Sequence, residues 1–392
     1  MNDAAHRHAQ AASDPSPAGE TTPFRFYDNR QKYLAFVNTC NEKAVVARRA
    51  AEELRHVRPS PPAVRIFDAG MGDGTVLARL LRATHRIFPT SPISVVAKEI
   101  SLEDVRLGLE KMPDRFQEHP ATVFVITNLN YAEAPRLMPR DVQAAAALNW
   151  QEVKLTGATA DEYAEQIDDL ATLLAHGWQT KPSPKTGNPV YVRPSVLVLY
   201  REDHKFVLDG VIPKPGQVFE SYDLVVASQP WRARMSAEFK AKKVLAPLTR
   251  SLAPGGRLLA IQSYGRDPGL EVIQQLWPDE NPFRTDRHEL LAALRSELGR
   301  DARDFTLAAP ADEKAIFRYE MHTLPSEIGD RIGTSTLFAA WNAAIYVNQI
   351  EDERLDAVLA SNAYLDATQT VLQKHGGLWF NDEIFVVTRR RA

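Results

Sequence analysis

The chain has 392 residues, of which 44% are hydrophobic, so it can bury a sizeable core. Its 47 Lys and Arg residues nearly balance its 50 Asp and Glu residues, a composition without the basic excess that is typical of nucleic-acid-binding proteins. Cys40 is the single cysteine, which excludes an internal disulfide and favours a reducing compartment. Because the chain shows neither a signal-peptide h-region nor an apolar run of roughly 18 residues, we expect a cytoplasmic protein without a membrane segment.

The N-terminal part is expected to contain a tail and one long helix. Residues 1–22 are rich in Ala, Pro, Ser and Asp and lack periodicity, which predicts a disordered tail. Apolar residues at three- and four-residue steps predict a helix over residues 31–55. Pro59, Pro61 and Pro62 end that helix before the first strand.

Residues 64–77 are the stretch around which the chain is organised. A short apolar run predicts a buried strand, and Asp68 follows it. Gly70, Gly72 and Gly74 then stand at alternate positions before an amphipathic helical pattern. Glycine lets a ligand approach the backbone closely, and the N–H groups at a helix start favour negative charge. The spacing differs from the Gly-x-Gly-x-x-Gly pattern of dinucleotide-binding proteins, so it disfavours a nicotinamide-dependent dehydrogenase.

Further strands are predicted in chain order, each followed by a polar segment. Residues 93–98 are followed by Glu99, residues 122–127 by Asn128, and residues 222–227 by Ser228-Gln229-Pro230-Trp231. A helix over residues 237–251 leads to Leu252-Ala-Pro-Gly-Gly256 and a strand over residues 257–263. After this strand, helices are predicted over residues 267–300, 337–350 and 355–374. Two short strands are predicted over residues 305–308 and 315–323, and a last strand over residues 378–388.

The connection between the third and fourth of these strands is unusually long. It spans roughly 90 residues, where about 2–6 are usual. A helix over residues 160–176 and strand-like runs at residues 149–155, 190–200 and 205–212 predict a small α+β unit. We therefore expect a main domain of residues 23–127 and 222–392, with residues 128–221 inserted as a substrate cap.

The glycine turn and the later Leu-x-Pro-Gly-Gly segment, in this order, resemble the class I S-adenosylmethionine-dependent methyltransferases. The resemblance implies a Rossmann-like α/β sheet with helices on both faces, and S-adenosyl-L-methionine as cofactor. It implies that Glu99 accepts hydrogen bonds from the ribose, a task that suits a carboxylate. Asn128, or its neighbour Asn130, would contact the adenine, although a simple turn asparagine explains either equally well. The remaining cofactor-binding residues implied are Asp68, Gly70, Gly72, Asp73, Gly74 and, from the N-terminal helix, Tyr33.

Residues 228–231 resemble the (Asp/Asn/Ser)-x-Pro-aromatic tetrapeptide of methyltransferases that act on planar amino groups. The resemblance implies that Ser228, Gln229 and Trp231 form the catalytic end of the site, with an amino nitrogen as methyl acceptor. Gln229 departs from the usual residue at its position, and a Trp231 that merely packs is the competing interpretation. The acceptor is expected to be a small molecule, a peptide or a protein, and the C-terminal helices provide a possible dimer surface.

Three alternatives remain open from the sequence. The acceptor can be an oxygen of a small molecule, or the chain can bind the cofactor without turnover, since a fold does not establish a function. Glu165 and Asp169, one helical turn apart, either steer a cationic acceptor or are simply solvated. No Cys/His cluster points to a metal site.

Overall fold

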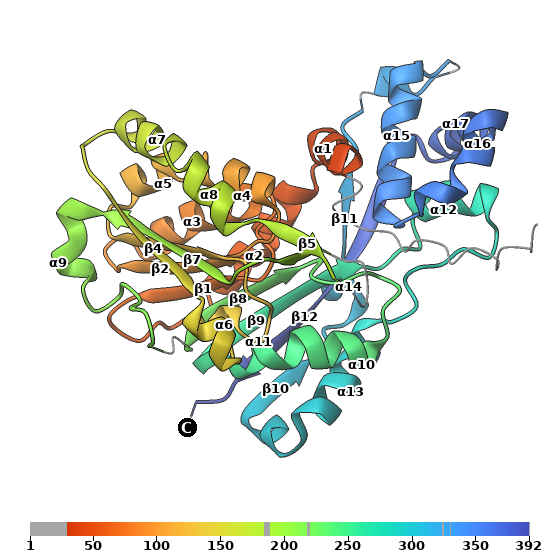
Figure 1. The fold of residues 1–392 in the computed structure, drawn as a ribbon. Helices are drawn as coiled ribbons and strands as arrows, with labels where there is room; N and C mark the ends of the chain where they lie inside the picture. The colour runs from red at the N-terminus through yellow and green to blue at the C-terminus, as the bar shows by residue number, and fades with distance from the viewer. Residues whose placement is uncertain (1–29, 184–188, 218–219, 324, 330, 392) are drawn as a thin grey trace, which may run out of the picture.

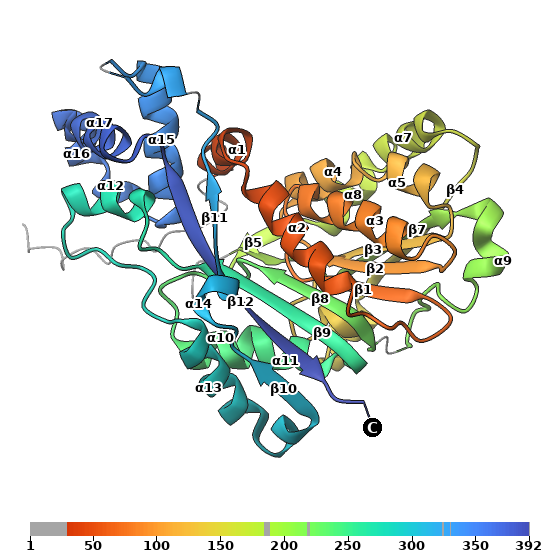
Figure 2. The same ribbon diagram turned by 180° about the vertical axis from the view of Figure 1, so that it is seen from behind.

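The computed structural model describes residues 30–183, 189–217, 220–323, 325–329 and 331–391. The predicted tail of residues 1–22 lies outside these ranges. Within them, one ten-stranded sheet forms the centre of the molecule (Figures 1 and 2). Its order is β10-β12-β9-β8-β1-β2-β3-β7-β4, with β11 paired to β12, so the predicted α/β fold class is confirmed.

The strands carry the buried apolar runs that the sequence predicted. The first strand, β1 (Val64–Asp68), is central and pairs in parallel with β2 (Ile93–Lys98) and β8 (Tyr222–Ser228). β12 pairs antiparallel with β9, β10 and β11 at the far edge. The other bounds are β3 (Thr122–Thr127), β4 (Asn149–Leu155), β5 (Thr180–Pro182), β6 (Pro189–Tyr191), β7 (Ser195–Arg201), β9 (Leu252–Ser263), β10 (Phe305–Ala308), β11 (Ile316–Glu320) and β12 (Trp379–Arg389).

Two apolar cores lie on the two faces of the sheet, because successive strand residues point to opposite sides. Ile66 belongs to the first core and Phe67 to the second. α2 (Glu42–Leu54) and α3 (Thr75–Ile87) cover one face, and α11 (Ala246–Arg250) and α13 (Arg287–Leu298) cover the other (Figures 1 and 2).

The remaining helices either are short or belong to one group that packs together. α1 (Arg30–Thr39), α12 (Pro268–Leu276), α15 (Thr334–Val347) and α17 (Ala363–His375) form one helical group, visible at the top of Figure 1. The shorter helices are α4 (Leu102–Leu109), α5 (Pro113–Glu118), α6 (Val142–Ala146), α7 (Ala160–Asp168), α8 (Ala171–Gly177), α9 (Lys205–Leu208), α10 (Ala237–Lys240), α14 (Asp312–Ala315) and α16 (Asp356–Ser361). None of the helices in the described ranges combines the length and apolar character that a membrane crossing requires.

The long helix predicted over residues 31–55 is wrong in one respect, because it breaks into α1 and α2. Cys40 leaves the helix to form a bridge with Met321. The backbone N–H of Asn41 donates to the carbonyl of Glu320 at 3.0 Å, and its side chain accepts from Glu320 at 2.9 Å. A distant strand end thus takes over the hydrogen bonds that would continue the helix.

The segment of residues 128–221 also differs from the expected cap. Its strands β7 and β4 join the central sheet beyond β3, with β7 antiparallel to β3. The predicted strand over residues 205–212 is wrong, since α9 occupies it and leaves Phe206 94% exposed. The predicted helix over residues 160–176 divides into α7 and α8. The domain boundaries themselves stay a prediction.

Candidate functional site

A cavity of about 650 Å³ opens where the strand order reverses around β1. Open α/β sheets bind ligands at such a switch point, outside the carboxyl ends of the strands. The turn after β1, the segment after β2 and the segment after β8 all reach it. The residues that line it are Tyr33, Lys43, Gly70, Gly72, Glu99, Ile100, Ser101, Leu102, Glu103, Asp104, Tyr131, Ala175, Trp178, Gln179, Thr180, Ser228, Gln229, Pro230 and Tyr346.

The three glycines after β1 have three different surroundings. A Cβ added at Gly70 would meet no atom within 4 Å, so only open cavity lies beside it. Gly72 has a φ of +55°, and an added Cβ would lie 2.9 Å from the Tyr33 hydroxyl. Gly74 faces away from the cavity, because its added Cβ would lie 2.6 Å from the Cα of Gly108 on α4. Gly70 and Gly72 therefore shape the cavity, whereas Gly74 permits helix packing.

Asp68 stabilises the glycine turn through a hydrogen bond to its backbone. Its Oδ1 accepts a hydrogen bond from the backbone N–H of Gly70 at 3.1 Å. Burial raises the pKa of Asp68 to about 6, and the neighbouring Glu99 carboxylate adds to this rise. Asp68 does not line the cavity itself, so it supports the turn that does.

Glu99 projects from the end of β2 into the cavity wall. Its Oε2 accepts from the backbone N–H of Gly72 at 2.9 Å. Its Oε1 accepts from Ile100 at 2.8 Å and from Ser101 at 2.9 Å. The indole N–H of Trp178 donates to the Glu99 carbonyl at 2.7 Å. One acidic residue thus joins the first two strand ends to the segment of residues 128–221.

Tyr33 and Lys43 form the wall that α1 and α2 supply. The Tyr33 hydroxyl accepts from the backbone N–H of Asp73 at 3.3 Å, and the Lys43 ammonium lies 5.4 Å from the Tyr33 ring centroid. The Lys43 ammonium is also 3.3 Å from Oε2 of Glu42. Burial alone would lower the pKa of Lys43, but Glu42 and Tyr33 hold it well above its usual value. Lys43 is therefore a partly buried cation at the edge of the cavity.

Besides Asp68 and Gly74, two further predicted cofactor residues do not line the cavity. Asn128 is buried, its side-chain amide donates to the carbonyls of Gly177 and Arg193, and its Oδ1 accepts from Ser195 at 2.8 Å. Asp73 accepts from the backbone N–H of Thr75 at 3.3 Å at the start of α3. Both side chains hold loops in place, because their oxygens already serve neighbouring backbone groups.

The segment of residues 228–231, after β8, reaches the cavity only in part. Ser228, Gln229 and Pro230 line it, and the Tyr131 hydroxyl donates to the Pro230 carbonyl at 2.9 Å. Trp231 points away and is only 7% exposed; its indole N–H donates to Oε1 of Gln262 at 3.1 Å. The structure therefore corrects the expectation that Trp231 forms an aromatic wall for the acceptor, and favours the interpretation that it packs in the core.

Gln229 has the least usual backbone of this segment, with a φ of +49°. Its backbone N–H donates to Ile261 at 2.9 Å, and its side chain donates to Oδ1 of Asp382 at 3.1 Å. Its Oε1 accepts from the backbone N–H of Ser263 at 3.2 Å. These bonds from β9 and β12 over-determine a conformation that non-glycine residues rarely adopt.

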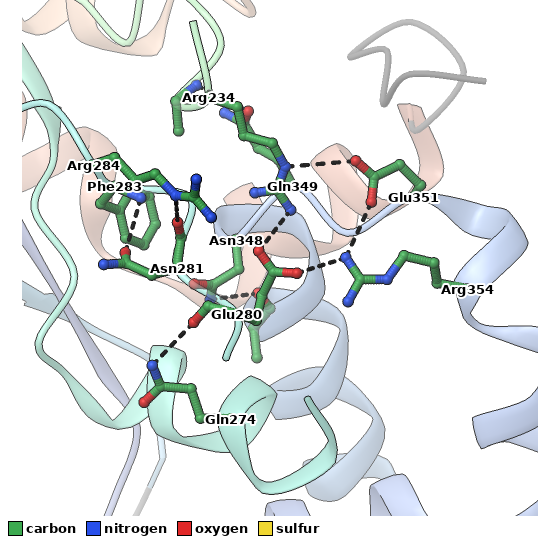
Figure 3. Close-up of polar contacts among 12 residues, drawn as sticks. Arg234, Gln274, Glu280, Asn281, Phe283, Arg284, Asn348, Gln349, Glu351 and Arg354 are labelled. Carbon is green, nitrogen blue, oxygen red and sulfur yellow. Dashed lines mark hydrogen bonds and ion pairs between the residues drawn. The ribbon is translucent and has the colours of Figure 1, made fainter. Parts of the chain in front are cut away.

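An ion-pair cluster holds the residues that follow (Figure 3). Arg234 lies 3.1 Å from Glu280 and 3.6 Å from Glu351, and Arg354 contacts the same two carboxylates at 2.6 and 3.4 Å. The Gln349 side chain accepts from the backbone N–H of Ala233 at 3.0 Å. The residues that follow β8 are therefore tied to the loop after α12 and to the loop between α15 and α16.

Sequence reasoning missed several residues of the cavity wall. Lys43 follows Tyr33 by ten positions across the α1–α2 break, and Tyr346 comes from α15. Trp178 and Gln179 come from the end of α8. Glu165 and Asp169 are exposed on or beside α7 and do not line the cavity, which agrees with the solvated alternative. No cluster of metal-ligating side chains occurs in the part of the chain that the structure describes.

Comparisons with known proteins were made for sequence and for structure. No family model and no curated protein matches the chain. Among solved structures, it is similar to the cyclopropane synthase MmaA2 from Mycobacterium tuberculosis, with 12% identity and a TM-score of 0.31, covering 87% of this chain and 83% of that one. Geranyl diphosphate methyltransferase matches at 14% identity and a TM-score of 0.29, covering 87% and 76%. The [4+2]-cyclase SpnF matches at 12% identity and a TM-score of 0.31, covering 96% and 90%.

Identities and TM-scores at this level decide neither an activity nor a ligand. The strand order and the position of the glycine turn carry the assignment of the fold instead. β1 is central, β2 and β3 lie to one side, β8 and β9 to the other, and antiparallel β12 is inserted between β9 and β10. The fold is the Rossmann-like α/β type that the resemblance to class I methyltransferases implied.

Proposed function

We propose that the chain binds S-adenosyl-L-methionine in the 650 Å³ cavity and transfers its methyl group to an acceptor. The observation that carries this proposal is the meeting of Glu99 with the glycine turn. A carboxylate at the end of β2 faces the cavity beside the backbone N–H of Gly72, 2.9 Å from its Oε2. Carboxylate oxygens accept several hydrogen bonds, so the two ribose hydroxyls of the cofactor find acceptors at Glu99.

The rest of the cavity fits the other parts of the same molecule. Gly70 leaves open space beside the backbone, where the amino-acid end of the cofactor would lie. Lys43 supplies a partly buried cation for its carboxylate. Ile100, Leu102 and Trp178 provide apolar surface for a purine ring.

The cofactor supplies a methyl group on a sulfonium: as a nucleophile bonds to the methyl carbon, the carbon–sulfur electron pair stays on sulfur and S-adenosylhomocysteine results. The residues of this chain then have two tasks. They hold the acceptor in line with the methyl group, and they exclude water from the reacting atoms. The buried contacts of Glu99, Tyr33 and Gln229 keep the wall ordered for both tasks.

An amino nitrogen is the acceptor that the cavity favours. Ser228 and Pro230 present a hydroxyl and backbone carbonyls, which accept hydrogen bonds from N–H groups. No histidine occurs among the described residues that line the cavity, whereas an alcohol acceptor would need a stronger base than an amine does.

Calorimetric titration and a turnover assay together test the proposed function. The chain should bind S-adenosylmethionine and S-adenosylhomocysteine and should not bind NADH. With methyl-labelled cofactor and a panel of small amines, alcohols and peptides, label should appear in an amine, with one equivalent of S-adenosylhomocysteine formed. Binding of NADH alone would reject the proposal, and label in alcohols alone would reject the nitrogen acceptor.

A further inference from the structure

A small chamber of about 60 Å³ adjoins the large cavity. Lys43, Gln229 and Tyr346 line both spaces, so the two are neighbours across these side chains. The other residues of its wall are Phe36, Glu42, Ser263, Tyr319, Val347 and Gln349. Since one water needs about 10–15 Å³ by this measure, the chamber has room for a group of a few heavy atoms.

One buried carboxylate lines this chamber and a second lies behind Gln229, and each has an oxygen that receives no hydrogen bond. Glu42, which is 5% exposed, lines the chamber. Its Oε2 receives no hydrogen bond, although the Lys43 ammonium lies 3.3 Å away as an ion-pair partner. Asp382 is 0% exposed and lies behind Gln229; its Oδ1 accepts from the Gln229 amide, and its Oδ2 has no donor. Glu42 keeps its ion pair with Lys43, but a buried carboxylate oxygen without a hydrogen bond costs free energy, so a donor at this oxygen would stabilise it.

The electrostatics of Asp382 agree with a cation binding in the chamber. Burial, together with the nearby Glu42 carboxylate, raises the pKa of Asp382 well above its usual value. Asp382 therefore resists ionising while no positive charge is close. A ligand in the chamber that brings N–H donors and a positive charge would bond to Glu42 and would favour the ionised form of Asp382 behind Gln229.

Aromatic rings complete the chamber wall. The Phe36 and Tyr346 centroids are 5.0 Å apart, and the Phe36 and Tyr319 centroids are 6.0 Å apart with edge-to-face geometry. Aromatic faces attract cations and pack against alkyl chains. One carboxylate and three aromatic rings in the same wall are surroundings that suit an alkylammonium group.

We propose that this chamber binds the amine end of the methyl acceptor, which is an aliphatic primary or secondary amine that arrives as its ammonium ion. The proposal rests on the proposed function, since it places the acceptor next to the cofactor at Gln229. When the carboxylate of the cofactor pairs with Lys43, the Glu42 carboxylate is left for the ammonium group. One proton then passes from the ammonium nitrogen to a Glu42 oxygen, which leaves the nitrogen lone pair available.

Calorimetry on the full chain saturated with S-adenosylhomocysteine tests the chamber without requiring turnover. The probes are n-propylamine, which is protonated at pH 7.5, and 1-propanol, which has a similar shape and no charge. Propylamine should bind at least tenfold more tightly than propanol, as expected for one charge-assisted hydrogen bond. Equal binding of the two probes, or of neither, would overturn the chamber proposal.

Variants connect the binding to the two carboxylates. Glu42→Gln should weaken propylamine binding at least tenfold, and Asp382→Asn, which lies behind Gln229, should weaken it less. Glu53→Gln is the matched control, because Glu53 is a half-buried, ion-paired carboxylate on the same helix, about 16 Å from Glu42 along the axis. It should bind propylamine as the wild type does. Asp382 is fully buried, so Asp382→Asn can fail to fold. In that case Glu42→Gln alone decides the outcome.

The affinity for S-adenosylhomocysteine, measured in the same experiment, separates the two proposals. If the wild type binds S-adenosylhomocysteine but Glu42→Gln binds propylamine like Glu53→Gln, the chamber proposal is wrong and the proposed function stands. If the wild type does not bind S-adenosylhomocysteine, the proposed function is wrong and the chamber proposal falls with it.

Discussion

The Glu99 carboxylate accepts a hydrogen bond from the backbone N–H of Gly72, with 2.9 Å between Oε2 and the nitrogen. The two residues follow adjacent parallel strands, β1 and β2, and both line the cavity. The carboxylate therefore orders the glycine turn and faces the ligand space with the same group. Loss of Glu99 should therefore lower cofactor affinity in two ways, by removing a direct contact and by disordering the glycine turn.

Glu99→Ala is expected to lower the affinity for S-adenosylmethionine at least about tenfold. It removes charge-assisted hydrogen bonds worth about 1.5–3 kcal/mol each, and tenfold equals about 1.4 kcal/mol. Glu99→Gln keeps one carbonyl oxygen for the backbone donors and should lose less. Calorimetry gives both values, and an unchanged affinity in Glu99→Ala would show that the ribose does not lie there.

The glycines at positions 70 and 74 should separate binding from stability. Gly70→Val places a side chain in open cavity, so the free energy of unfolding should stay near that of the wild type while cofactor binding is lost. Gly74→Ala places a Cβ 2.6 Å from backbone at a φ of +78° and should cost at least about 1–3 kcal/mol in stability. Urea unfolding and calorimetry on both variants check this. If Gly70→Val binds the cofactor normally, the ligand lies elsewhere.

Trp231→Ala should act mainly on stability. The side chain is 7% exposed, packs in the second core and donates to Gln262, so truncation should cost about 3–5 kcal/mol. Trp231→Phe keeps a ring and loses the hydrogen bond, which should cost about 1 kcal/mol. Urea unfolding measures both. A fully stable Trp231→Ala with altered acceptor kinetics would restore the role that the sequence suggested.

Asp68 predicts a pH dependence of stability. Its pKa is about 6 in the folded chain against an ordinary value of 3.8, because the folded state disfavours the buried charge. Below about pH 4 Asp68 is protonated and does not destabilise the folded state. As the pH rises through about 6 the buried carboxyl ionises, and the free energy of unfolding falls. Asp68→Asn cannot ionise, so it should gain about 3 kcal/mol relative to the wild type between pH 4 and pH 7. Urea unfolding at each pH tests this, and a constant difference would contradict it.

The fold was largely predictable because buried parallel strands form continuous apolar runs. β1, β2, β3, β8 and β9 were each recognised from such a run and from the turn that follows it. The break between α1 and α2 was not predictable, because Asn41 pairs with Glu320, a residue distant in the sequence. The error at residues 205–212 arose from a short apolar segment, which periodicity alone cannot assign to strand or helix.

The site was predictable only where its residues follow a local motif. Gly70, Gly72 and Glu99 stand directly after strands, and the structure brings them to one cavity. Asn128 and Trp231 also follow strands, but the direction of a side chain at a strand end cannot be deduced from its position. Lys43 and Trp178 reach the cavity through packing of distant elements, which a sequence pattern does not reveal.

The antiparallel direction of β7 has a consequence for how this protein can change. Because β7 runs against β3, its first residue rather than its last lies near the cavity, beside the end of β3. The chain that precedes β7, from Trp178 onward, can therefore form part of the ligand wall. Asn128 clamps both ends of that chain, at Gly177 and Ser195. Trp178, Gln179 and Thr180 follow the first anchor directly, so substitutions at these three positions would change the ligand wall while β1 and β2 stay untouched.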